Sequence, residues 1–117
     1  MTDFDSPEML HAIDELDKGN YSAAFALLLP LAEAGNPRAQ CNLATLYQAG
    51  LGVEPDGRKA VELYQTVAEQ NIRESCLSGI AYNNLATIYI TGGPGIEPDR
   101  QKSQEFKERA RALGFEM

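Results

Sequence analysis

Residues 39–68 read AQCNLATLYQAGLGVEPDGRKAVELYQTVA, which joins a helical pattern, a glycine-rich turn and a second helical pattern. Residues 81–110 repeat this plan as AYNNLATIYITGGPGIEPDRQKSQEFKERA. Leu43 recurs 42 residues later as Leu85, and one added residue in the second turn makes the offset 43 from there on. Self-similarity at a period of roughly 20 to 50 residues is typical of a stacked repeat array. The stretch therefore predicts an all-α chain built from helical hairpins.

The length of the chain indicates how many domains it forms, and its charge argues against some classes of binding partner. Its 117 residues suffice for one domain with a continuous core. It carries 17 acidic and 10 basic side chains, a net charge of −7. A protein that binds nucleic acid or an anionic membrane is expected to show a basic face, so the balance argues against both kinds of partner. Acidity usually serves solubility, and attraction to a basic partner is the alternative.

The sequence shows no export signal and no disulfide framework. Residues 1–5 lack a positive region and an apolar stretch, and no run of about 18 apolar residues occurs. We therefore expect a cytoplasmic protein, unless a leader has been removed. Cys41 and Cys76 are too few for a disulfide scaffold, and the repeat register separates them by about 10 Å of helical rise. Both are predicted to be free thiols.

The first 35 residues predict a helix pair that is a degenerate copy of the repeat. Ser6-Pro7-Glu8 is typical of a helix start, and Gly19-Asn20 ends this first helix. The next apolar pattern, 21–34, aligns with the helix at 57–70 at an offset of 36 residues. Pro30 lies inside it and lacks a backbone donor, which predicts a kink or a restart of the helix.

The later helices follow from the repeat. We expect helices over 37–49 and 57–70, joined by a turn in which Asp56 caps the second helix and Val53 enters the core. Before the third unit, the extra residues around 72–78 either extend the next helix backwards or form a loop, and their composition favours a loop. Helices over 79–91 and 99–113 follow, and Gly114-Phe115 predicts a helix stop with a hydrophobic contact. The single domain, 1–117, divides into a helix pair (6–35) and two repeats (37–71 and 79–115).

One stripe of each predicted helix is expected to be buried. Apolar residues recur at helical spacing along these stripes. The predicted core residues are Met9, Ala12, Ile13, Leu16, Ala24, Leu27, Leu28, Leu31, Ala32, Ala39, Leu43, Leu46, Tyr47, Ala60, Leu63, Tyr64, Val67, Ala68, Phe106, Ala110 and Leu113.

A recurring set of small, apolar and turn residues stands out in the stretch quoted first: Ala39, Leu43, Ala44, Leu46, Tyr47, Gly50, Gly52, Val53, Asp56, Lys59, Ala60, Tyr64 and Ala68. This set resembles the Sel-one-like repeat family, relatives of the tetratricopeptide repeats. The copy after residue 80 departs from it, with Ser103 in place of alanine and Lys107 in place of an aromatic residue. The resemblance covers roughly residues 20 to 115. It implies an α/α superhelix, a right-handed solenoid of about three antiparallel helix pairs, whose first helices line a concave face. It also implies a role as adaptor or scaffold, and no reaction.

Possible catalytic, nucleotide and metal sites have weak support. Residues 52–59 approach the spacing of a phosphate-binding loop, but arginine stands in the lysine position and no strand precedes the loop. The repeated Glu-Pro-Asp is explained by helix capping, because calcium needs a denser set of oxygen ligands. Cys41 has only His11 as a basic partner, and two cysteines and one histidine so far apart do not predict zinc. We expect no enzyme activity, no metal and no cofactor.

The first helix of each repeat carries a candidate surface for a protein or peptide partner. Asn42 and Asn84 occupy the same register, as do Thr45 and Thr87. Asparagine amides can hold the backbone of an extended peptide, and Arg38 can add a carboxylate clamp. The alternative is that these side chains are polar groove residues, or bond to the neighbouring turn. The candidate residues are Arg38, Cys41, Asn42, Thr45, Gln48, Asn83, Asn84, Thr87, Ile90 and Thr91.

A second class of function places binding at the ends or on the acidic exterior of the array. About three helix pairs barely suffice for an independent stack, so exposed apolar ends can drive self-association or docking onto a larger complex. A particular form is a small acidic inhibitor or immunity-type protein that neutralises a basic toxin or enzyme. Replacement of Asn42 and Asn84 by alanine separates these hypotheses, since only groove binding should be lost.

Overall fold

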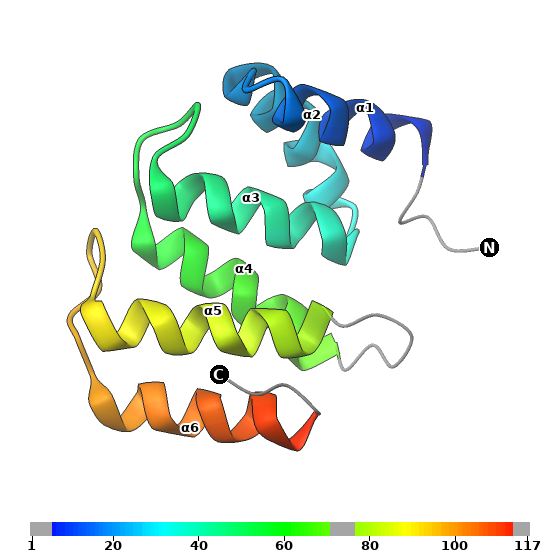
Figure 1. Cartoon of the computed structure of the whole chain (residues 1–117). Coiled ribbons are helices and arrows are strands. Elements are labelled where there is room, and N and C mark those ends of the chain that lie inside the picture. Colours follow the sequence, from blue (N-terminus) through cyan, green and yellow to red (C-terminus); the bar gives the residue numbers. More distant parts are fainter. Residues whose placement is uncertain (1–5, 71–76, 114–117) are drawn as a thin grey trace.

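The computed structural model describes residues 6–70 and 77–113, and these form six α-helices. Figure 1 shows the helices stacked in chain order, with the α3–α4 and α5–α6 connections at the same edge of the stack. Each helix packs against the next, and α3 also contacts α5. The predicted all-α repeat superhelix is thereby confirmed. The helices are α1 (Pro7–Asp17), α2 (Tyr21–Glu33), α3 (Pro37–Ala49), α4 (Gly57–Gln70), α5 (Leu77–Thr91) and α6 (Arg100–Ala112).

Local capping sets where the second helix of each repeat begins. The carboxylate of Asp56 accepts a hydrogen bond from the N–H of Lys59 at 3.1 Å. In the next unit, Asp99 accepts one from the N–H of Lys102, also at 3.1 Å. Such caps satisfy backbone donors that the first helical turn leaves unpaired. The helix start predicted from Asp56 is confirmed.

Three expectations differ from the structure or lie outside it. Of the two alternatives for Pro30, a kink or a restart of the helix, the restart is wrong, because α2 continues to Glu33 and Pro30 C=O accepts the N–H of Ala34 at 3.0 Å. Leu113, predicted to be core, is 45% exposed, since it follows the last described helix and no further described helix covers it. The predictions for residues 71–76, Cys76 included, and for 114–117 lie outside the described residues, and α5 begins at Leu77.

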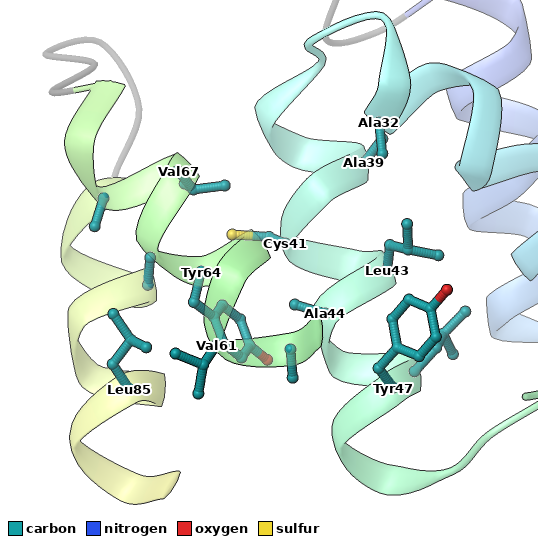
Figure 2. Packing of buried hydrophobic residues seen from close by; sticks show 14 of the residues in the cluster. Ala32, Ala39, Cys41, Leu43, Ala44, Tyr47, Val61, Tyr64, Val67 and Leu85 are labelled. Atoms are coloured by element: carbon teal, nitrogen blue, oxygen red, sulfur yellow. The ribbon is translucent and has the colours of Figure 1, made fainter. Parts of the chain in front are cut away.

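The core runs continuously through the stack. Figure 2 shows part of it, with Leu43 and Tyr47 on one side of α3 and Tyr64 and Val67 entering from α4. Phe25 of α2 meets the Tyr47 ring edge to face, with centroids 5.5 Å apart. This geometry adds to the free energy of apolar burial.

The core of the third unit includes side chains at positions where its sequence departs from the repeat or differs from the unit before it. Ser103, which replaces the usual alanine, is buried, and its hydroxyl donates to the carbonyl of Ala86 at 2.8 Å. Phe106 stacks between Tyr82 and Tyr89, with ring centroids 6.0 and 5.8 Å away. The buried hydroxyl therefore carries no unpaired donor.

The glycine-rich turns fix one repeat against the one before it. Gly52 has a φ of +73°, and a Cβ atom there would lie 2.5 Å from the backbone carbon of Tyr21 at the start of α2. One repeat later, Pro94 C=O accepts the N–H of Gly57 at 2.7 Å, at the start of α4. The α3–α4 connection thus contacts the N-terminal end of α2, and the α5–α6 connection contacts the N-terminal end of α4. Only glycine permits backbone atoms to approach this closely.

Candidate protein-binding surface

The predicted surface residues fall on two helices that touch. Arg38 to Gln48 belong to α3 and Asn83 to Thr91 belong to α5, and these two helices contact one another beside α4. Their side chains differ widely in exposure. Thr45, Thr87, Ile90 and Thr91 are exposed, Arg38, Asn42, Gln48, Asn83 and Asn84 are partly buried, and Cys41 is buried.

The hydroxyl of Tyr64 ties the two helices together. Its ring is fully buried in α4, yet the hydroxyl donates to Gln48 Oε1 at 3.0 Å and lies 2.9 Å from Thr45 Oγ1. Burial raises the pKa of Tyr64 to about 12, and hydrogen bonds from Thr45 and Asn84 oppose that rise. The phenol therefore stays protonated near neutral pH, and three of the candidate residues have a structural task in satisfying it.

Asn42 and Asn84 share a register but not an environment. Asn84 lies beside the hydroxyl of Tyr64. The residue that precedes Tyr64 by one repeat is Leu28, which is buried and carries no polar atom in its side chain. Within the described residues, Asn42 has no side-chain hydrogen bond, although it is partly exposed. Its amide is thus available to an external partner, whereas that of Asn84 already serves the fold.

The position one residue earlier is directed inward in both repeats. Cys41 is 8% exposed, and Figure 2 shows its sulfur on the side of α3 that faces α4. It is a free thiol, as predicted, and burial raises its pKa to about 12. At the equivalent Asn83, the side-chain oxygen is buried and has no hydrogen-bond partner among the described residues. Cys41 therefore offers a partner almost no surface.

Thr87 and Thr91 are exposed on α5, and their hydroxyl groups donate to backbone carbonyls of the same helix. Thr87 Oγ1 donates to the carbonyl of Asn83 at 3.0 Å, and Thr91 Oγ1 to that of Thr87 at 3.2 Å. Such a hydroxyl retains lone pairs that can accept a hydrogen bond from a partner's N–H. Ile90 is 44% exposed beside them, so α5 offers both acceptors and an apolar contact.

Among the described residues, the Cys41 and His11 side chains weighed as a catalytic pair lie on different helices in different environments. His11 lies on α1, largely exposed and 3.8 Å from a carboxylate oxygen of Glu15, while Cys41 is buried against α4. Residues 6–70 and 77–113 contain no group of three or more histidine, cysteine or acidic side chains that could hold a metal ion. No helix in that part of the chain is long and apolar enough to cross a membrane.

Tyr64 is the residue that the sequence did not mark as part of this surface. Its helical spacing placed it in the core, which is correct for the ring. A buried phenol nevertheless needs a hydrogen-bond partner, and that requirement is the signal that points to the polar residues around it.

Comparison with protein families supports the repeat assignment. The Sel1 repeat model matches residues 11–36, 37–72 and 79–115. Among characterised proteins, the chain is similar to Chitin synthase regulator SKT5 of Malassezia restricta, with 30% identity over 80% of this chain and 7% of that protein. It is also similar to Chitin synthase regulatory factor 3 of Schizosaccharomyces pombe, with 31% identity over 74% of this chain and 9% of that protein.

A further relative is Cytochrome c oxidase assembly factor 7 of Xenopus tropicalis, with 36% identity over 52% of this chain and 24% of that protein. The chain thus spans about a quarter or less of the length of each of these relatives.

Solved structures show the same fold. A Sel1 repeat protein from Oxalobacter formigenes has a TM-score of 0.74 and 26% identity, over 95% of this chain and 41% of that one. The protective antigen c5321 of uropathogenic Escherichia coli has a TM-score of 0.75 and 23% identity, over 92% of this chain and 22% of that one. The second similarity bears on the fold alone.

Proposed function

Because the chain belongs to the Sel1 repeat family, we propose that it is a non-catalytic interaction module that binds a peptide or protein along α3 and α5. Sel1 repeat proteins are protein-interaction adaptors, and the named relatives are regulators and an assembly factor. The proposal gives this chain the same kind of role and leaves its partner unnamed.

The observation that carries the proposal is the free amide of Asn42. It is partly exposed in the middle of α3 and has no hydrogen bond to a described residue. One primary amide can donate to a peptide carbonyl and accept from a peptide N–H, which suits an extended backbone. Arg38, one turn earlier, can contribute a charged donor to a carboxylate of the same partner.

The non-catalytic part of the proposal rests on the chemistry of the nucleophile candidates. A thiol with a pKa of about 12 supplies almost no thiolate near neutral pH. Tyr64, with its pKa also raised to about 12, is a hydrogen-bonding group of the fold. Within residues 6–70 and 77–113, neither group has a hydrogen bond to a basic side chain that would give it the activation covalent catalysis needs. The cytoplasmic location expected from the sequence stays a prediction.

The test compares variants in a capture experiment with the source cell's extract. One tagged variant combines Asn42→Ala with Thr87→Ala, which changes two partly or fully exposed side chains of α3 and α5 and leaves the contacts of Tyr64 intact. A matched control combines Gln101→Ala with Gln104→Ala on exposed positions of α6.

We expect mass spectrometry to find a protein captured by wild type and by the α6 control but lost from the α3–α5 variant. Capture that survives the α3–α5 variant would refute the proposal. It would favour instead the array ends or the acidic exterior, as an inhibitor of a basic enzyme would require. Recovery of the chain alone would favour self-association.

A further inference from the structure

A hollow lies between α2 and α4, on the side of α3 opposite to the proposed α3–α5 surface. Its apolar lining includes Leu29 of α2, Leu43 and Tyr47 of α3, and Leu63 of α4, and its volume is about 280 Å³. Thr45 lies between Leu43 and Tyr47 in the sequence. Because successive helical residues turn by about 100°, Thr45 points away from this lining by roughly 200°. The hollow is therefore separate from the α3–α5 surface.

The next repeat shows why this space is open. The counterpart of Leu63 is Phe106, and the counterpart of Tyr47 is Tyr89. Phe106 is 8% exposed and stacks on Tyr89 with centroids 5.8 Å apart. The smaller, branched Leu63 supplies no ring to stack on Tyr47, so the space beside the tyrosine is filled by an aromatic side chain in one repeat and open in the other. The interface of α6 with α4 and α5 keeps a different hollow, of about 360 Å³, lined by Ala68, Tyr82 and Arg109 among others.

The same comparison indicates what accompanies the ring. In the filled interface, the guanidinium of Arg109 lies 5.8 Å from the centroid of Phe106 and 5.9 Å from that of Tyr82. The position equivalent to Arg109 in the hollow interface is Thr66, which has no charge. At these two positions the hollow thus has neither the ring of Phe106 nor the charge of Arg109, although Phe25 and Lys59 also contact the Tyr47 ring.

The rim of the hollow is complementary to a cation. Glu33 of α2 and Glu62 of α4 line it, and both are exposed. Neither forms an ion pair within residues 6–70 and 77–113. The nearby ammonium of Lys59 lies over the Tyr47 ring, 5.4 Å from its centroid. Two carboxylates against one lysine leave the rim negative, in a chain of net charge −7.

We propose that the hollow between α2 and α4 binds a partner segment that presents an aromatic side chain with a lysine or arginine three or four residues away. The ring stacks in the space beside Tyr47, and the cation lies at the Glu33 and Glu62 carboxylates. On a helix this spacing puts both side chains on one face, as for Phe106 and Arg109 of α6. This site is independent of the proposed α3–α5 surface.

The test is a selection of displayed 16-residue random peptides on the wild-type chain and on Leu63→Phe. The substitution copies the filled interface, so the variant is expected to fold. We expect wild type to enrich peptides with an aromatic residue and a basic residue at the stated spacing, and Leu63→Phe to enrich none of them. Equal enrichment on both chains, or no enrichment on wild type, would overturn the proposal.

An enriched peptide is then made synthetically and its affinity is measured by fluorescence anisotropy. We expect at least a tenfold weaker affinity for Leu63→Phe, and about threefold or more for Glu33→Gln with Glu62→Gln. The second variant changes only exposed side chains and keeps the proposal testable if Leu63→Phe does not fold. Asn42→Ala should bind the peptide as wild type does, which separates this site from the α3–α5 surface.

A second copy of the chain is the competing occupant. Sedimentation of the wild-type chain over a range of concentrations should show no association that Leu63→Phe removes. Dimers abolished by Leu63→Phe would assign the hollow to self-association and overturn the proposal.

Discussion

The hydroxyl of Thr45 lies 2.9 Å from the hydroxyl of Tyr64, and this contact joins the exposed face of α3 to a fully buried ring of α4. Either hydroxyl can be the donor in this contact, because Tyr64 also lies within hydrogen-bond distance of Gln48 Oε1, at 3.0 Å, and Thr45 of the carbonyl of Cys41, at 3.1 Å. Polar side chains on the surface of α3 thus satisfy the hydroxyl of a side chain that belongs to the core.

Tyr64→Phe is expected to lower the free energy of unfolding by about 1 kcal/mol, since it removes the hydroxyl and leaves its partners able to turn toward water. Urea unfolding at pH 7 measures the change. Tyr47→Phe is the matched control, because the Tyr47 hydroxyl has no hydrogen bond within the described residues. Equal losses in the two variants would contradict the role given to the Tyr64 contacts.

The stability order of wild type and Tyr64→Phe should reverse in alkali. The folded-state pKa of Tyr64 is raised from 10.0 to about 12. The stabilisation is therefore complete below pH 10 and is lost as the pH rises from 10 toward 12, because the unfolded chain releases its proton first. The loss is about 1.4 kcal/mol per pH unit in that window. Denaturant titrations at pH 7 and pH 11 measure the difference in free energy of unfolding between wild type and Tyr64→Phe. The same difference at both pH values would refute the raised pKa of Tyr64.

Gly52→Ala should destabilise the fold by about 2 kcal/mol or more, because it combines a positive φ with a Cβ atom 2.5 Å from the Tyr21 backbone. Gly19→Ala isolates the first effect: Gly19 has a φ of +79° and no atom within 4 Å of the added carbon. Thermal unfolding of both variants distinguishes the contributions. If Gly52→Ala cost no more than Gly19→Ala, the close contact between repeats would be unimportant for stability.

Cys41 should react with a thiol reagent only when the chain opens. Its thiol is 8% exposed and its pKa is raised to about 12, so both access and thiolate are scarce. In a Cys76→Ser background at pH 8, we expect labelling to be about a hundredfold slower in the native chain than in guanidinium chloride. Similar rates in the two conditions would place Cys41 at the surface instead.

The features that the sequence predicted well are those with local causes. The bounds of α3 and α4 agree with the prediction at both ends, since proline and aspartate mark their starts and glycine follows α3. Capping and turn chemistry act within a few residues, so they can be read from the chain.

The features that the sequence missed depend on how neighbouring helices meet. The sequence analysis assumed one buried stripe for each helix and therefore assigned Cys41 to the exposed groove. In the structure α3 contacts α2, α4 and α5, so more than one of its faces is covered. The repeat register likewise equated Asn42 with Asn84, whereas Asn84 lies beside the hydroxyl of Tyr64 and the counterpart of Tyr64 one repeat earlier is the apolar Leu28. The hollow beside Leu63 was likewise not predicted, because its shape depends on how side chains from α2, α3 and α4 pack together.

The most direct test of the proposed function is photo-crosslinking of the captured partner from single positions. A photoreactive side chain at exposed Thr87 of α5 is compared with one at exposed Gln101 of α6. We predict a crosslinked product from position 87 that disappears with Asn42→Ala, and none from position 101. A product from position 101 alone, unaffected by Asn42→Ala, would contradict binding along α3 and α5.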